Sequence, residues 1–379
     1  EKSEKVMDSR FVLTRKPLEP SDVLAAKAED LLLEDQEHGP CKAKCRHVMQ
    51  GYSEPSALDV ESATPQVLRD SVVFVAQILA SVGWTPGFLD FTQAFHSGDP
   101  IQRELYCRQP KEGIPGAAPE QILKLLKTRY GLTDGPLAWY KHLTRRLVAD
   151  FGYVVSRADP CVFYLHGQAK GGEPSLKGII GVATDDLLHG GDEDRWKNVE
   201  QIAREYKLGK NQVKKGRFTG KDIAVQDDGS ILIDQAFYVE DKLKMIEIPR
   251  KRRQQRYSKC TAAEVEQMRS QLGALSWLAK ETRCDLAGRV CLLQQAFPEP
   301  KVMDLLECNR VIKEAHEHKD LGIRVMPIPW QRLRVSVVTD AAWGNAKDQI
   351  WLEDHPSDFW EETDETWIRH HRQPRRTPF

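Results

Sequence analysis

An apolar stretch interrupted by two adjacent carboxylates constrains this chain more than any other feature. Residues 178–183 are Gly-Ile-Ile-Gly-Val-Ala, and after one threonine come Asp185 and Asp186, followed by two leucines. This pattern predicts a hairpin of two buried strands with the acids at its turn. Adjacent carboxylates beside buried strands raise each other's pKa unless a cation neutralises them, so a divalent metal is one interpretation. Paired aspartates are also ordinary turn residues, and the pair alone does not decide between the two.

A third acid ends another predicted strand. Residues 87–89 are Gly-Phe-Leu, and Asp90 follows them. If the two strand ends lie side by side in one sheet, Asp90 joins Asp185 and Asp186. Three such carboxylates are the ligand set of sites that transfer phosphoryl or nucleotidyl groups with two magnesium ions. An unrelated metal phosphohydrolase would use the same acids.

Composition sets wider limits on fold and location. A chain of 379 residues exceeds one ordinary domain, so two or three subdomains are expected. The net charge of −1 gives no global attraction to nucleic acid, so such binding must come from local patches. Eight cysteines without paired spacing indicate reduced thiols in an intracellular protein. The most apolar stretch, 72–84, is too short to span a bilayer, so no membrane association is expected.

Local patterns predict several further elements. Helices are expected over 67–81, over 136–151 after a cap at Asp134 or Gly135, over 195–208, and from a capping box formed by Thr261 and Glu264. Strands are expected at 217–223 and 230–235, around a turn at 227–229.

Three blocks, in this order, resemble a known family. They are Leu-Asp-Phe-Thr-Gln-Ala-Phe at 89–95, Tyr-Gly-Leu-Thr-Asp-Gly-Pro-Leu-Ala-Trp-Tyr at 130–140, and Thr-Asp-Asp-Leu-Leu at 184–188. Their order and spacing resemble the reverse transcriptase region of copia-type retrotransposon Pol polyproteins, over roughly residues 40–345. The resemblance implies an α+β, right-hand polymerase with fingers, palm and a partial thumb, acting as an RNA-directed DNA polymerase.

The resemblance also implies a division of the chain. The expected parts are a lead-in at 1–39, fingers and palm at 40–245, a helical thumb or connection at 246–330, and a truncated ribonuclease H-like segment with a basic tail at 331–379. Within the last part, Asp340 matches the first metal-binding acid of a ribonuclease H domain. The residues after Asp340 do not continue that pattern, so we expect no complete ribonuclease H site.

Roles for particular residues follow from the same resemblance. Asp90, Asp185 and Asp186 would be catalytic and would hold two Mg²⁺ ions, or Mn²⁺ in their place. The residues implied in nucleotide binding are Lys44, Arg46, Phe91, Phe95, Tyr130 and Gly131. The ring of Phe95 would exclude a ribose 2′-hydroxyl. Read without the resemblance, Phe95 is a core aromatic, and Lys44 and Arg46 are a solvated strand edge.

Two departures from the family pattern bear on activity. Ala183-Thr184 replaces a Tyr-Val pair whose ring supports the primer terminus. Thr133-Asp134 stands where a basic and an amide residue are common, and an acid near template phosphates weakens binding. The sequence therefore leaves open an alternative, a decayed retroelement fragment that binds nucleic acid without polymerising.

The densest basic run contains Arg250, Lys251, Arg252 and Arg253. It could neutralise template and primer phosphates, act as a nuclear localisation signal, or be a solvated linker. The expected partners are an RNA or DNA template with its primer and deoxynucleoside triphosphates, while oligomeric state is left open. The expected location is a cytoplasmic particle or the nucleus, and Glu1 in place of methionine suggests a piece of a longer protein.

Overall fold

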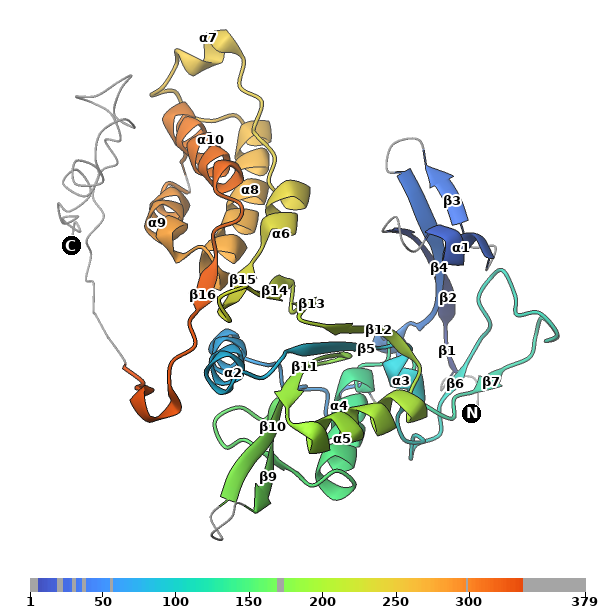
Figure 1. The fold of residues 1–379 in the computed structure, drawn as a ribbon. Coiled ribbons are helices and arrows are strands. Elements are labelled where there is room, and N and C mark those ends of the chain that lie inside the picture. Colours follow the sequence, from blue (N-terminus) through green and yellow to red (C-terminus); the bar gives the residue numbers. More distant parts are fainter. Residues whose placement is uncertain are drawn as a thin grey trace, which may run out of the picture. The chain divides into compact units, whose positions relative to one another are not determined.

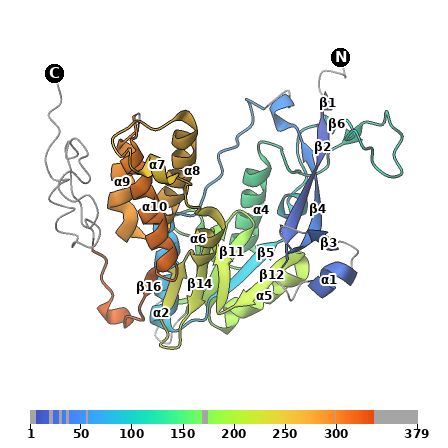
Figure 2. The same cartoon turned by 90° about the horizontal axis from the view of Figure 1, so that it is seen from above.

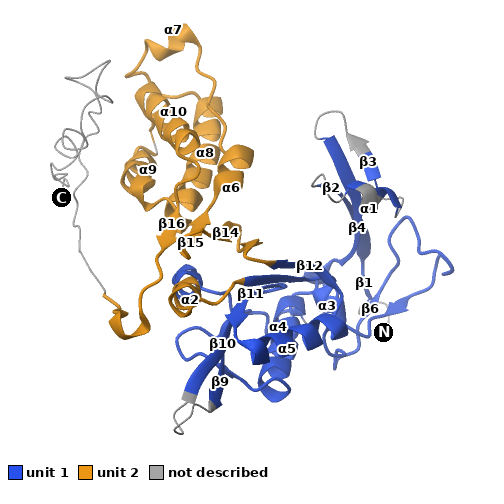
Figure 3. Ribbon diagram, in the orientation of Figure 1, with its two compact units in different colours: residues 1–75, 87–212 blue, residues 76–86, 213–379 orange. Residues whose placement is uncertain are grey.

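The computed structural model describes residues 6–18, 23–28, 32–35, 39–54, 57–168, 174–297 and 299–336. The chain forms two compact units, of which unit 1 contains residues 1–75 and 87–212, and unit 2 contains residues 76–86 and 213–379 (Figure 3). Helix α2 (Arg69–Val82) passes from one unit to the other and confirms the helix predicted at 67–81. Asp340 and all of the predicted ribonuclease H-like segment after residue 336 lie outside the described residues.

Unit 1 is built on a six-stranded sheet with the order β12-β5-β11-β10-β9-β8 (Figure 1). Its strands are β5 (Gly87–Phe91), β8 (Tyr153–Val155), β9 (Val162–Gln168), β10 (Pro174–Ala183), β11 (Asp186–Gly191) and β12 (Leu208–Val213). Strands β10 and β11 form the predicted hairpin, with Gly178 opposite Gly191 and Ala183 opposite Asp186. Ile179 and Ile180 on β10 and Leu187 and Leu188 on β11 are buried as consecutive pairs, as expected of strands at the centre of a sheet that is covered on both faces.

Two helices cover this sheet, and the fold is therefore of the predicted mixed α and β class. Helix α4 (Gly135–Ala149) contributes Leu143 and Leu147 to the core, and α5 (Glu193–Glu205) contributes Val199 and Ile202 (Figures 1 and 2). Both helices confirm predicted elements, with α5 starting and ending slightly earlier than expected. Their apolar residues recur every three or four positions, which places them on the sheet-facing side.

Two smaller sheets complete unit 1. In the first, β2 (Ser9–Pro17) pairs along its whole length with β4 (Gly39–Met49), and β3 (Leu32–Asp35) pairs with the other edge of β4. The second contains β1 (Val6–Met7), β6 (Tyr106–Cys107) and β7 (Leu123–Lys124). The short helices are α1 (Val23–Ala28) and α3 (Ala94–Ser97). Because residues 9–17 and 39–49 share a sheet, the predicted boundary at residue 39 does not separate two parts of this fold.

Unit 2 joins a four-stranded sheet to a helical bundle. Its elements are β13 (Lys215–Phe218), β14 (Lys221–Val225), β15 (Ile231–Asp234), β16 (Ile323–Val325), α6 (Ala236–Lys242), α7 (Arg250–Arg253), α8 (Ala262–Glu281), α9 (Ala287–Gln295) and α10 (Val302–Glu317). The core of the bundle is made by α6, α8, α9 and α10. The capping box of Thr261 and Glu264 is confirmed at the start of α8. In the described ranges, no helix combines the length and apolarity needed to cross a membrane.

Candidate active site

Strands β5 and β11 bring the three predicted acids together. Asp186 lies directly opposite Asp90 in the antiparallel pair, and Asp185 occupies the turn between β10 and β11. The backbone N–H of Phe91 donates to the carbonyl oxygen of Asp185 at 2.9 Å, which ties the turn to the end of β5. Side chains of directly opposed residues leave the same face of a sheet with Cβ atoms about 5 Å apart. The prediction that two distant strand ends meet in one sheet is confirmed.

Proximity and burial change the protonation of these acids. Burial, and then the charges of Asp185 and Asp90, raise the pKa of Asp186 to about 7. Burial is also the main cause that raises the pKa of Asp185, and the charge of Asp90 adds to it. A backbone hydrogen bond and the charges of Lys44 and Arg46 oppose this rise at Asp185. The site therefore holds more negative charge than its own surroundings balance, which favours a cation.

The carboxylates fit magnesium by chemistry but do not form a finished coordination shell. In the described part of the chain, no group of three or more acidic, histidine or cysteine side chains is placed to hold a metal ion. The carboxylate of Asp90 lies toward β12, where a Cβ on Gly209 would come 2.3 Å from Asp90 Oδ2. Hard oxygen ligands suit Mg²⁺, and a bound ion would remove the repulsion that raises these pKa values.

Strand β12 supplies two site residues that are not among those predicted from the sequence. Gly209 leaves room for the Asp90 carboxylate, and the charge of Lys210 lowers the pKa of Asp186 against the two acids that raise it. β12 lies beside β5 in the sheet, and the N–H of Thr92 donates to the carbonyl of Lys207 at 2.8 Å. No local pattern marks Gly209 or Lys210, because their importance depends on which strand becomes the neighbour of β5.

A buried tryptophan holds the turn that carries Asp185. Trp139 on α4 is fully buried, and its Nε1–H donates to the carbonyl oxygen of Thr184 at 2.7 Å. Thr184 has a φ of +55°, a left-handed conformation that costs a branched residue energy. The Trp139 ring packs edge-on against Phe91 and Tyr206, at 5.1 and 5.8 Å between centroids. Trp139 therefore fixes the peptide that precedes Asp185 in a conformation that Thr184 would not adopt by preference.

Phe91 lies in the core of unit 1, whereas the family resemblance predicts that it contacts the nucleotide. Its ring is only 2% exposed and packs in the core against Trp139 and Tyr206. Successive residues of a strand point to opposite faces, so a strand that presents Asp90 to the site directs Phe91 into the core. The role that this position supports is to anchor β5 behind Asp90.

Four of the other predicted nucleotide-binding residues converge on one place. Phe95 packs edge-on against Tyr130 with 5.2 Å between ring centroids, and the guanidinium carbon of Arg46 lies 5.7 Å from the Tyr130 centroid. Gly131 has a φ of +93°, and a Cβ there would come 2.0 Å from the carbonyl oxygen of Met49. The backbone of β4 therefore approaches Gly131 so closely that a side chain would not fit there. Lys44, also on β4, is exposed, and its charge reaches Asp185.

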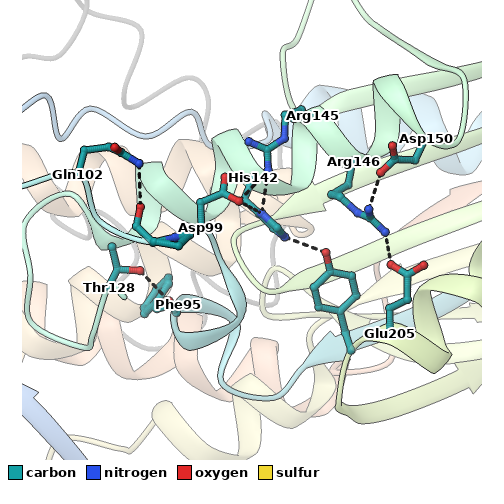
Figure 4. Close-up of polar contacts among 11 residues, drawn as sticks. Phe95, Asp99, Gln102, Thr128, His142, Arg145, Arg146, Asp150 and Glu205 are labelled. Carbon is teal, nitrogen blue, oxygen red and sulfur yellow. Dashed lines mark hydrogen bonds and ion pairs between the residues drawn. The ribbon is translucent and has the colours of Figure 1, made fainter. Parts of the chain in front are cut away.

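Polar contacts fix the segments on which Phe95 lies (Figure 4). The hydroxyl of Thr128 donates to the carbonyl of Phe95 at 2.6 Å, which joins the segment before Tyr130 to α3. His142 on α4 lies 3.0 Å from Asp99 and 2.8 Å from the hydroxyl of Tyr206. No local sequence pattern predicts this network, because its members are far apart in the chain.

The acid that was expected to weaken template binding is neutralised. Asp134 is buried, and its carboxylate accepts two hydrogen bonds from the Arg103 guanidinium, at 2.6 and 3.0 Å. Arg103 also donates to Glu54 at 2.7 Å. Asp134 occupies the predicted cap position of α4 but makes no side-chain cap bond, because the charged fork of Arg103 is the stronger partner.

The basic run in unit 2 divides into two pairs of residues. Arg252 donates to both carboxylate oxygens of Glu264 at 2.9 Å, and Arg253 donates to the carbonyl of Ile248 at 2.8 Å. Arg252 therefore joins α7 to α8, and Arg253 joins α7 to the segment before it, which favours a structural role for these two members of the run. Arg250 and Lys251 are exposed and form no ion pair among the residues that the structure describes.

Comparison with known proteins gives a consistent result. The family described as "Reverse transcriptase (RNA-dependent DNA polymerase)" matches residues 15–254, which is more than half of the chain. A retrovirus-related Pol polyprotein from transposon RE1 of Arabidopsis thaliana is 25% identical over 333 residues, 83% of this chain and 22% of that protein. The Pol polyprotein from transposon TNT 1-94 of Nicotiana tabacum is 28% identical over 130 residues, 33% of this chain and 10% of that protein.

A solved structure of a foamy viral protease-reverse transcriptase in complex with double-stranded DNA has a TM-score of 0.42 and 11% identity, covering 83% of this chain and 54% of that chain. The chain spans about a fifth or less of the length of the two plant relatives. The order of motifs and the family match agree, and the chain belongs to the reverse transcriptase (RNA-dependent DNA polymerase) family, with similarity to the Pol polyproteins of copia-type retrotransposons.

Proposed function

We propose that this chain is an RNA-directed DNA polymerase that transfers a deoxynucleotide to the 3′-hydroxyl of a primer. The observation that carries the proposal is the strand register that sets Asp186 opposite Asp90 and places Asp185 at the adjoining turn. A polymerase needs clustered carboxylates, because its substrates bring the negative charge of phosphates to the reacting atoms. The raised pKa values of Asp185 and Asp186 support a site built for cations.

In this proposal, Asp90 and Asp185 would hold two magnesium or manganese ions, and the carboxylate of Asp186 would add a third negative charge beside them. Two bound ions would supply Lewis-acid activation of the primer hydroxyl and stabilisation of the pyrophosphate leaving group. Trp139 keeps the Asp185 turn in place, and the missing side chain of Gly209 leaves space for the Asp90 carboxylate. Lys44 and Arg46 are the cations on β4 that would grip the triphosphate, since their charges already reach Asp185.

The right-hand arrangement belongs to the same proposal. The six-stranded sheet with α4 and α5 would be the palm, the β2-β4-β3 sheet the fingers, and the helices of unit 2 a partial thumb. A template with its primer and deoxynucleoside triphosphates would be the substrates. Phe95 would act as the gate against ribonucleotides, because its ring is braced by Tyr130 and its carbonyl by Thr128.

The test is extension of a DNA primer on an RNA template with magnesium. We expect extension by the unmodified chain and none by Asp185→Asn, because this change removes metal-binding charge and no core volume. Glu200→Gln, which neutralises an exposed acid on α5, is the matched control and should extend normally. Near-normal extension by Asp185→Asn would contradict the proposal.

In the same assay, Phe95→Val should raise the incorporation of ribonucleotides relative to deoxynucleotides. If this ratio does not change, Phe95 is not the residue that excludes the 2′-hydroxyl.

The second candidate is a nucleic-acid-binding fragment that has lost catalysis. It is favoured by Ala183-Thr184, which leaves no aromatic ring at the β10–β11 turn itself. The same experiment separates the two candidates. Tight binding of template and primer without extension by the unmodified chain supports the fragment, whereas magnesium-dependent extension rules it out.

A further inference from the structure

The Tyr130 ring is surrounded by cationic and imidazole groups from three segments of unit 1. Arg46 on β4 lies 5.7 Å from its centroid, and the ring of His96 on α3 lies 5.5 Å away. Arg129 precedes Tyr130, and its Nη1 lies 3.4 Å from Nε2 of His96. The hydrogen bond from Thr128 to the carbonyl of Phe95 fixes this segment beside α3 (Figure 4).

Arg46 and Arg129 lack the direct carboxylate contacts that two other half-buried arginines make. Arg103 and Arg289 each bind two carboxylates. Neither Arg46 nor Arg129, both half-buried, forms an ion pair with a carboxylate among the residues that the structure describes. A guanidinium cannot lose its proton at neutral pH, so both arginines stay positively charged. Asp185 interacts with the charge of Arg46, but it forms no ion pair with either arginine in the described structure.

The neighbouring histidines respond to this charge. Burial, with Arg129 and His47 adding to it, lowers the pKa of His96 to about 4. Burial, and then the charge of Arg129, also lower the pKa of His47. A neutral His96 can accept a hydrogen bond from Arg129 at Nε2. This contact orients the guanidinium and leaves most of its N–H groups free of other hydrogen bonds in the described structure.

We propose that Arg129, oriented by His96, binds a phosphate group of the substrates beside Tyr130. The inference rests on the proposed polymerase function and adds a residue to it, since Arg46 is the only member of this cluster that the family resemblance assigns to the triphosphate. A guanidinium presents paired donors that match two phosphate oxygens. The phosphate would belong either to the triphosphate of the incoming nucleotide or to the backbone of the template strand.

The test measures binding without catalysis, so that it stays separate from the polymerase assay. Inorganic tripolyphosphate is titrated into the full chain by calorimetry, and a primer–template is titrated by fluorescence anisotropy between about 50 and 200 mM salt. The variants are Arg129→Gln and the matched control Arg204→Gln, which removes an exposed charge on α5. For Arg129→Gln we expect about a tenfold loss, the size of one charge-assisted hydrogen bond.

The two sources of phosphate give different results. Weaker tripolyphosphate binding identifies the triphosphate, whereas weaker primer–template binding with a salt slope reduced by about one identifies a backbone phosphate. Unchanged binding of both ligands by Arg129→Gln overturns the proposal. If Arg129→Gln does not fold, Arg129→Lys keeps the charge but loses the fork, and unchanged binding of both ligands by that variant overturns it instead. If Asp185→Asn abolishes extension while Arg129→Gln still weakens ligand binding, the polymerase function and the phosphate-binding role of Arg129 are both supported.

Discussion

At the residue scale, Asp186 has the largest resolved pKa shift of the three acids. Its pKa is 3.8 in the unfolded reference and about 7 in the fold, because of burial and then of Asp185 and Asp90. The folded-state pKa is raised, so the protonated carboxyl contributes stability at low pH, and this contribution is lost as pH rises to about 7. Above that pH, in the absence of metal, the charged side chain destabilises unit 1.

We therefore predict that Asp186→Asn stabilises the metal-free chain at pH 8. The expected rise in Tm is about 2–4 °C, measured by calorimetry in the presence of a chelator. The difference from the unmodified chain should shrink as pH is lowered toward 4, where Asp186 is protonated. The matched control is Asp194→Asn on the exposed start of α5. Equal Tm values for Asp186→Asn and the unmodified chain at pH 8 would show that Asp186 carries no such cost.

Trp139 gives a second prediction at this scale. Trp139→Phe keeps a ring in the core but removes the donor to Thr184, so the turn that carries Asp185 loosens. We expect kcat for primer extension to fall about tenfold while KM for the nucleotide changes little, because a misplaced carboxylate weakens the transition state more than binding. Trp277→Phe on α8, where Trp277 is 40% exposed, is the control. An unchanged kcat would show that Trp139 only fills the core and does not position Asp185.

The three acids of the site could be predicted from the sequence, but the residues that surround them in the fold could not. Asp90, Asp185 and Asp186 each interrupt or end a local apolar run, so a pattern of a few residues predicts them. Gly209 and Trp139 matter because of contacts with Asp90 and Thr184, which the tertiary fold makes. Such partners depend on strand order and helix packing, and neither is encoded in a short stretch.

At the scale of elements, the start of α8 shows how a loop is joined to a helix. Glu264 accepts hydrogen bonds from the N–H of Thr261 at 2.8 Å and from Arg252 at 2.9 Å. The hydrogen bond from Arg252 is the main reason that the pKa of Glu264 falls from 4.5 to about 2. A lowered carboxyl pKa contributes stability that is present above pH 4.5 and is lost as pH falls toward 2.

The corresponding prediction is that Glu264→Gln lowers the free energy of unfolding by about 1 kcal/mol at pH 7, after solvent screening is allowed for. Urea unfolding followed by circular dichroism measures this difference. At pH 2.5 the difference should be small, since the unmodified Glu264 is then partly protonated. Glu266→Gln, on the exposed side of the same helix, should be neutral at both pH values. A loss at pH 7 that persists unchanged at pH 2.5 would contradict the ionic explanation.

In helix α7, we expect different residues of the basic run to affect nucleic-acid binding and stability. The double variant Arg250→Gln, Lys251→Gln should weaken primer–template binding and reduce its salt slope by about one to two, with no change in Tm. Arg252→Gln should instead lower Tm, because it removes the partner of Glu264. Anisotropy titrations over a range of salt give both quantities, with Lys313→Gln on α10 as the control. An unchanged salt slope in the double variant would identify α7 as a solvated linker.

Elements were predicted best where the signal was local. The capping box of α8, the hairpin of β10 and β11 and helix α2 all follow from spacing along the chain. The strand predicted at 217–223 is instead two strands, β13 and β14, because Thr219 and Gly220 both have a positive φ and reverse the chain. A threonine gives no warning of such a turn, since its ordinary preference is for strands.

At the scale of the whole molecule, each unit has its own core, and the chain crosses between them more than once. Residues 76–86 belong to unit 2 although both flanking segments belong to unit 1. The predicted divisions at residues 39, 245 and 330 came from family order, which treats a domain as a continuous stretch of chain. The order of motifs along the chain cannot predict that residues 76–86 belong to unit 2, because this depends on how α2 packs in the folded protein. All three acids and all the predicted nucleotide-binding residues lie in unit 1.

The most direct test of the account is a count of metal ions bound beside the three acids. Electron paramagnetic resonance can count Mn²⁺ ions in a complex of the chain with a terminated primer, an RNA template and the next deoxynucleotide. We predict two bound ions for the unmodified chain and fewer for Asp185→Asn, with Glu200→Gln unchanged. An equal number of bound ions in Asp185→Asn and the unmodified chain would contradict the claim that Asp90, Asp185 and Asp186 form a two-metal polymerase site.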